Sequence, residues 1–232
     1  MERKYYEAYD DRYRQVHSQN LQWFYDDPTP IVMDTIHKFN IRQDQTILEL
    51  GCGEGRDASP LLKKGYSLLA TDISPAAICY AQRKWPEFAD HFSVLDCIGG
   101  EISGKYDFIY AVAVIHMLVE DSDRDQFYTF IREHLNTNGI ALICTMGDGK
   151  TERQTDICTA FDLQNRTHEQ TGKEVRIAKT SCRMVSFETL HAELKRNGLK
   201  ILKEGITAAQ PDFSELMYVI VKNTKINYEE MK

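Results

Sequence analysis

The residues of this chain that could do chemistry begin in one glycine-rich stretch. An apolar, β-prone run, 46–50, carries an acid, Glu49, and leads into three glycines at alternate positions, Gly51, Gly53 and Gly55. Glycine has no Cβ and tolerates positive φ, so a ligand can lie directly on the main-chain N–H groups of such a turn. A strand, a glycine turn and a helix form the general plan of nucleotide sites in α/β proteins. A glycine-rich loop without a ligand is the alternative.

Two further carboxylates follow the next two predicted strands. Asp72 comes after the run 66–71, about 20 residues beyond the glycine turn, which is the separation expected for an acid that binds ribose hydroxyls. Its two oxygens match two hydroxyl donors. Asp96 comes after the run 92–95. A plain turn acid is the alternative at both positions.

This combination resembles the motifs of the class I S-adenosylmethionine-dependent methyltransferases. The resemblance implies that Glu49 and the turn after it hold the amino-acid end of the cofactor. It also implies that Asp72 holds the ribose, that Asp96 accepts from the adenine amino group, and that the next backbone N–H serves a ring nitrogen. The residues assigned to S-adenosyl-L-methionine in this way are Glu49, Gly51, Cys52, Gly53, Asp72, Ile73, Asp96, Cys97 and Ala111.

Residues 1–30 are crowded with aromatic side chains, several of them at helical spacing. One interpretation is a helix that packs on the core through its ring faces. The other is a helical lid over cofactor and substrate, because N-terminal helices often close this pocket in the family that the chain resembles. Tyr13 and Trp23 are the candidate ligand contacts.

His116 follows a continuous apolar run, 106–115, of the kind found in strands buried on both faces. In the fold implied by the resemblance, that strand ends at the reaction centre. With an unperturbed pKa of ~6.5, a histidine there suits a general base near neutral pH. A hydrogen-bonded packing histidine is an equal alternative. No metal-ligand cluster is visible in the sequence.

Residues 147–185 interrupt the regular alternation of strands and helices, and 175–185 could add one strand. The stretch is rich in basic residues within an acidic protein. We interpret it as a substrate-side insertion whose arginines could pair with an acidic group on the substrate. Ordinary solvated charges are the alternative.

The order of predicted elements defines the fold class. Strands alternate with helices, which predicts a parallel sheet with helices on both faces. The last two strands have no helix between them, which predicts one antiparallel strand. We therefore expect an α/β protein with a doubly wound, seven-stranded, mostly parallel sheet, the Rossmann-like methyltransferase fold. Residues 1–232 would form a single domain with the lid at 1–30 and the insertion at 147–185.

Composition narrows the class of partner and compartment. A net charge of −7 argues against a broad nucleic-acid surface. No apolar run approaches the ~20 residues of a membrane span, and the first residues lack the apolar core of a signal peptide. Six scattered cysteines without a Cys-x-x-Cys pair are typical of reduced thiols. We expect a cytoplasmic monomer or homodimer that acts on a small molecule.

The predicted reaction is in-line displacement, in which an O, N or S nucleophile of a small molecule takes the methyl group. The stretch 111–115 lacks the Asn-Pro-Pro-Tyr type signature of many DNA and glutamine methyltransferases. RNA or protein methylation, and cofactor binding without catalysis, remain alternatives. An NAD(P)-dependent oxidoreductase is disfavoured, because Arg56 stands where that fingerprint has its last glycine.

Overall fold

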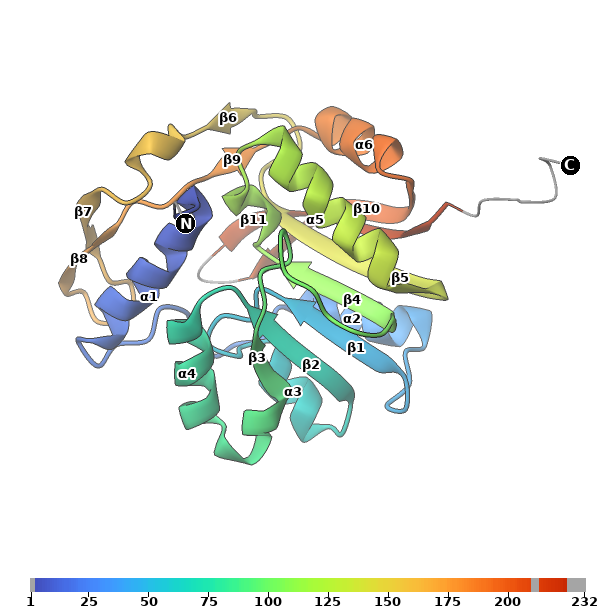
Figure 1. Ribbon diagram of the computed structural model, residues 1–232, viewed down its shortest axis with the longest axis horizontal. Helices are drawn as coiled ribbons and strands as arrows, with labels where there is room; N and C mark the ends of the chain where they lie inside the picture. Colours follow the sequence, from blue (N-terminus) through green and yellow to red (C-terminus); the bar gives the residue numbers. More distant parts are fainter. Residues whose placement is uncertain (1–2, 210–212, 225–232) are drawn as a thin grey trace, which may run out of the picture.

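The computed structural model describes residues 3–209 and 213–224, and seven of its strands form one sheet in the order β10-β11-β5-β4-β1-β2-β3 (Figure 1). Strand β11 runs antiparallel to both of its neighbours, β10 and β5, while the other neighbouring pairs are parallel. The predicted fold class is therefore confirmed. The strands are β1 (Thr46–Leu50), β2 (Ser67–Asp72), β3 (Phe92–Val94), β4 (Tyr106–Val112), β5 (Leu135–Met146), β10 (Leu199–Ala209) and β11 (Phe213–Asn223).

Helices cover both faces of this sheet, and each face has its own apolar cluster (Figure 1). On one face lie α2 (Pro30–Phe39), α3 (Ala58–Lys63) and α4 (Pro75–Lys84). On the other lie α5 (Asp121–His134) and α6 (Phe187–Arg196). Burial on both faces explains why the central strands read as continuous apolar runs.

Local signals set the ends of these helices. The Ser74 hydroxyl accepts a hydrogen bond from the Ala77 N–H at 3.0 Å, and Pro75 occupies the first helical position of α4. Ser186 accepts in the same way from Thr189 at the start of α6. Both caps satisfy a backbone donor that a helix N-terminus leaves without a partner.

The N-terminal segment and the stretch 147–185 lie together at one end of the sheet (Figure 1). Helix α1 (Ala8–His17), preceded by the 3₁₀ turn η1 (Tyr5–Glu7), packs between α4 and β8. Instead of one added strand, residues 147–185 form two small two-stranded sheets. These pair β6 (Arg153–Gln154) with β9 (Arg183–Met184), and β7 (Leu163–Thr167) with β8 (Glu174–Ala178), and the segment also holds the 3₁₀ turn η4 (Ile157–Thr159).

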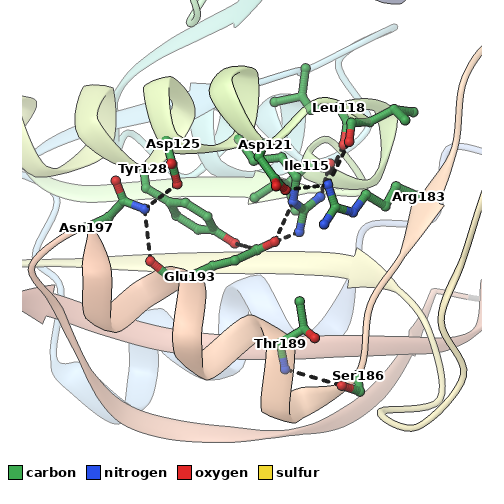
Figure 2. A network of polar contacts seen from close by, with 12 residues as sticks. Ile115, Leu118, Asp121, Asp125, Tyr128, Arg183, Ser186, Thr189, Glu193 and Asn197 are labelled. Carbon is green, nitrogen blue, oxygen red and sulfur yellow. Dashed lines mark hydrogen bonds and ion pairs between the residues drawn. The ribbon is translucent and has the colours of Figure 1, made fainter.

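A fully buried ion pair joins α5 to α6 and to the turn after β4 (Figure 2). Both Arg124 and Glu193 are 0% exposed, and the guanidinium donates to the two carboxylate oxygens at 2.8 and 2.7 Å. The hydroxyl of Tyr128 donates to the same carboxylate. The remaining arm of Arg124 donates to the carbonyls of Ile115 and Leu118, which fixes the 3₁₀ turn η3 (Ile115–Met117) from behind.

We predict that Glu193→Gln lowers the free energy of unfolding by about 3–5 kcal/mol, because it leaves a buried guanidinium without its counter-charge. Urea unfolding monitored by circular dichroism measures this loss. The control is Asp44→Asn, which breaks the exposed pair of Arg42 and Asp44 and should cause only a small fraction of that loss. Similar small losses in both variants would contradict the role given to Arg124.

Candidate active site

A pocket of about 860 Å³ lies where the carboxyl ends of β1, β2 and β4 meet α1. Eight of the residues predicted from the sequence line it. They are Glu49, Gly51, Cys52, Gly53, Asp72, Ile73, Cys97 and Tyr13. Carboxyl ends of parallel strands at a change of strand order are the usual place for such a site in an open α/β sheet.

The turn after β1 needs its glycines because other parts of the molecule approach it closely. Gly51 has a φ of 73°, and a Cβ there would lie 2.3 Å from a methyl group of Val114. Gly53 has a φ of 54°, and a Cβ there would lie 2.6 Å from the hydroxyl of Tyr13. Any larger residue would meet both backbone strain and a collision. The loop after β4 and α1 therefore lie directly against the glycine turn.

Asp72 joins the turn after β1 to the start of α4. Its Oδ2 accepts from the Gly53 N–H and its Oδ1 from the Ser74 N–H, each at 2.8 Å. Burial raises the pKa of Asp72 to about 6, although the two N–H donors act in the opposite direction. A carboxylate offers about four acceptor positions. Two therefore remain for hydroxyl donors on the pocket side.

Glu49 is 2% exposed, and its Oε2 has no hydrogen-bond partner within residues 3–209 and 213–224. Burial, and then the nearby Asp57 carboxylate, raise the pKa of Glu49 well above its usual range. Buried polar atoms normally have a partner. A ligand ammonium group in the pocket would supply both a donor and a counter-charge. This orphaned acceptor fits the amino-acid end of S-adenosylmethionine.

Three other buried acids attach the N-terminal segment to this site, and sequence reasoning assigned none of them a role. Glu54 accepts from the backbone N–H groups of Trp23 and Phe24 and contacts His17 at 2.7 Å. Asp57 accepts from the N–H and the hydroxyl of Thr29, and Asp10, on α1, accepts from the hydroxyl of Ser74. Glu54 lies between Gly53 and Gly55, and Asp57 follows Gly55 by two residues, but no sequence pattern identifies their partners in the N-terminal segment.

Four predicted residues do not line this pocket. Asp96 accepts from the Ile98 N–H at 2.9 Å and faces an adjoining hollow that also contains Ile73. Ala111 is buried within β4, whereas the three residues after it, including the left-handed Ala113 (φ 57°), do line the pocket. Trp23 and His116 belong to a second pocket. Cofactor contact by Asp96, Ala111 and Trp23 stays a prediction.

The second pocket, of about 1050 Å³, lies against the first and shares three lining residues with it, namely Tyr9, Phe24 and Met117. Its walls come from α1, from η3 and from the stretch 147–185. His116 is 4% exposed, and its Nδ1 has no partner among the described residues. Burial, and then Arg124 and Arg12, lower the pKa of His116 to about 3. The imidazole is therefore neutral near pH 7, and it is a far weaker base than the unperturbed value of the sequence analysis implied.

Reactive thiols are not part of this geometry. Burial, and then Asp96, raise the pKa of Cys97 to about 12, and burial raises that of Cys52 well above its usual range. Both side chains are neutral near pH 7 and behave as small apolar groups. The arrangement instead offers a backbone cradle, two buried acids and a second chamber next to them. It can bind two small molecules side by side and exclude water from the contact between them.

Comparison with known proteins agrees with this geometry. Residues 48–141 match the model of a family described as "Methyltransferase domain". An S-adenosylmethionine-dependent methyltransferase from Clostridium acetobutylicum has a similar structure, with a TM-score of 0.65 at 16% identity, over 95% of this chain and 99% of that one. The glycopeptide N-methyltransferase MtfA, in complex with S-adenosyl-L-methionine, has a TM-score of 0.62 at 19% identity, over 88% of this chain and 97% of that one.

A curated relative in sequence is the Hemagglutinin 1 of Eikenella corrodens, which is 29% identical over 126 residues. The match covers 50% of this chain and 41% of that protein. Within the described residues, no helix combines the length and apolar character needed to cross a membrane. Residues 48–141 thus match a methyltransferase-domain family, and the fold around them is similar to that of solved S-adenosylmethionine-dependent methyltransferases, as the resemblance in the sequence indicated.

Proposed function

We propose that this protein transfers a methyl group from S-adenosylmethionine to an O, N or S nucleophile of a small molecule by in-line displacement. The observation that carries the proposal is the pair of adjoining pockets that share Tyr9, Phe24 and Met117. A reaction of this kind requires two molecules held in line with each other and shielded from water. Two chambers with a common wall of apolar and aromatic side chains suit that requirement.

The first pocket would hold the cofactor through residues at successive strand ends. We assign the amino group to Glu49, the carboxylate end to the backbone of the glycine turn, and the ribose to Asp72. Apolar side chains beside Asp72, namely Ile73, Leu95 and Cys97, would bury the adenine. When bound, the cofactor supplies an electrophilic methyl group on a sulfonium. The residues of the chain then need only to orient the reactants and exclude water.

Tyr13 and its neighbours would act as the lid of this pocket. The hydroxyl of Tyr13 lies over Gly53, and the buried acids Glu54, Asp57 and Asp10 hold the N-terminal segment in place. The stretch 147–185 closes the second chamber, which supports its proposed role as the substrate-side insertion. A chamber with walls from α1, η3 and the stretch 147–185 favours a small acceptor over a nucleic acid or a folded protein.

His116 is our candidate catalytic residue in the second pocket. A neutral imidazole with an unpartnered, buried Nδ1 can accept a hydrogen bond from the nucleophile and so orient it. Because the pKa of His116 is low, its imidazole is too weak a base to remove a proton from the nucleophile. Its proposed role is therefore orientation of the acceptor.

The compartment and assembly are part of the same proposal. The described cysteines are all free thiols, and we propose a cytoplasmic protein that works as a monomer or homodimer. RNA methylation would require a basic surface, and the net charge of −7 disfavours it.

We predict that the protein binds S-adenosylhomocysteine but not NADH in isothermal titration calorimetry. The affinity for S-adenosylhomocysteine should fall as the pH drops through about 6. The ionised Asp72 is the form that accepts the ribose hydroxyls, and its pKa of about 6 means that protonation removes this acceptor at lower pH.

The Asp72→Asn variant should bind about 10- to 100-fold more weakly, since hydrogen bonds to a charged group contribute about 1.5–3 kcal/mol. Its affinity should also lose the pH dependence near pH 6. Asp162→Asn, at an exposed acid outside both pockets, serves as the matched control. Unchanged affinity in Asp72→Asn would remove the ribose assignment, and binding of NADH would contradict the proposed function.

We predict that His116→Ala lowers kcat at least about tenfold, the effect of ~1.4 kcal/mol, while the Kd for S-adenosylhomocysteine changes less than twofold. Because the pKa of His116 is about 3, the imidazole stays neutral from pH 5 to 8. The wild-type kcat should therefore show no histidine titration in this interval. A histidine-dependent fall in kcat near pH 6.5 that disappears in the variant would restore the general-base interpretation.

A further inference from the structure

The second pocket carries more positive charge than its acidic protein would suggest. Four basic residues line it, and the acid among its lining residues is Glu169. The basic residues are Arg12, Arg153, Arg166 and Lys179. Exposed charges of this kind are often only solvated, so the burial and partners of each one decide whether the charge serves a ligand.

Arg12 is the best-placed of these charges. It is 7% exposed, and its Nε and Nη2 donate to the carbonyls of Ala178 and Lys179 and to the hydroxyl of Thr180. None of its hydrogen bonds within the described residues comes from Nη1, and none goes to a carboxylate. A buried guanidinium normally has a counter-charge. Arg12 therefore keeps both its charge and one donor arm for the pocket it lines.

Arg166 adds a second positive charge at the same place. The guanidinium groups of Arg12 and Arg166 lie 5.1 and 5.3 Å from the ring centre of Trp23. Two like charges held around one aromatic ring repel each other, and the pKa of Arg12 is lowered first by burial and also by Arg166. Glu169 lies 3.9 Å from Arg166 with both side chains half exposed, so it compensates little of this repulsion. An anion between the two arginines would relieve it.

Apolar and aromatic side chains form another part of the chamber. Trp23, Phe24, Phe213, Met117 and Met146 line it together with the neutral His116. This combination suits a molecule with an apolar or aromatic body and one acidic group. An arginine fork matches a planar carboxylate through two parallel hydrogen bonds, which makes such pairs both strong and directional.

We propose that the methyl acceptor of this enzyme is a carboxylate-bearing small molecule with an apolar or aromatic body. In this arrangement Arg12 and Arg166 hold the carboxylate at the side of the chamber formed by residues 147–185. The aromatic side chains that line the chamber direct the nucleophile toward the cofactor pocket. The inference rests on the proposed function, because it names the substrate class of that same site.

The test uses the full chain and two pairs of probes that differ only in charge, benzoate with benzamide and phenylacetate with phenylacetamide. Calorimetric titrations are carried out both with and without saturating S-adenosylhomocysteine, and inorganic phosphate is titrated in parallel. We expect at least one acid to bind about tenfold or more tightly than its amide, a difference of ~1.4 kcal/mol. We also expect this preference to weaken at high salt.

Two variants locate the binding site. Arg166→Gln removes one arm of the proposed clamp at a half-exposed position of β7, so the fold should persist. Arg176→Gln is the matched control, because Arg176 lies on the paired strand β8, is exposed and does not line the chamber. We expect Arg166→Gln to lose about fivefold or more in affinity for the acid, and Arg176→Gln to change it less than twofold.

Equal binding of acids and amides, or failure of both acids to bind, would overturn the proposal. Binding of phosphate in place of the carboxylates would also overturn it, since that would indicate an anion site without an apolar component. Equal losses in the two arginine variants would remove the assigned location. Failure of S-adenosylhomocysteine to bind is a separate outcome, which contradicts the proposed function. In that case the titrations without S-adenosylhomocysteine still show whether the pocket prefers the acids to the amides.

Discussion

The buried carboxylate of Asp72 is the contact on which the whole site depends. It ties the glycine turn after β1 to the start of α4 through two backbone hydrogen bonds of 2.8 Å. A buried acid is costly unless it is hydrogen-bonded, so this side chain fixes the relative position of two loops that belong to different strands. The same burial raises its pKa to about 6. The group that builds the cradle is also the one that we propose to hold the ribose hydroxyls.

The segments that cover the site are also held by buried charged groups with hydrogen-bond partners. Glu54 and Asp57 bind the N-terminal segment, Asp10 of that segment binds Ser74 at the start of α4, and Arg12 binds the stretch 147–185. Each of these charged groups is at least nine-tenths buried and is held by backbone atoms or hydroxyls. The lid and the insertion therefore form one wall joined through α1. We propose that this wall covers the cofactor pocket and completes the second chamber.

Sequence alone predicted those features that depend on local pattern. The strand and helix order, the glycine turn and the place of Asp72 at the end of β2 follow from periodicity, φ preference and spacing along the chain. The acids that hold the lid could not be predicted, because Glu54 and Trp23 are brought together only by the fold. The low pKa of His116 likewise depends on burial and on Arg124, which belongs to a different element. Asp96 followed the strand-end pattern, but its side chain faces an adjoining hollow.

Amide hydrogen exchange of the full chain, with and without S-adenosylhomocysteine, tests the central claim most directly. In the proposed cofactor site, one ligand contacts the backbone of the glycine turn, the end of β2 and the N-terminal lid at the same time. We therefore predict slower exchange in residues 51–55, 72–74 and 8–25 when the ligand is bound, with unchanged exchange in β10, which lies at the far edge of the sheet. Bound ligand with unaltered exchange in the first two segments would contradict the proposed site.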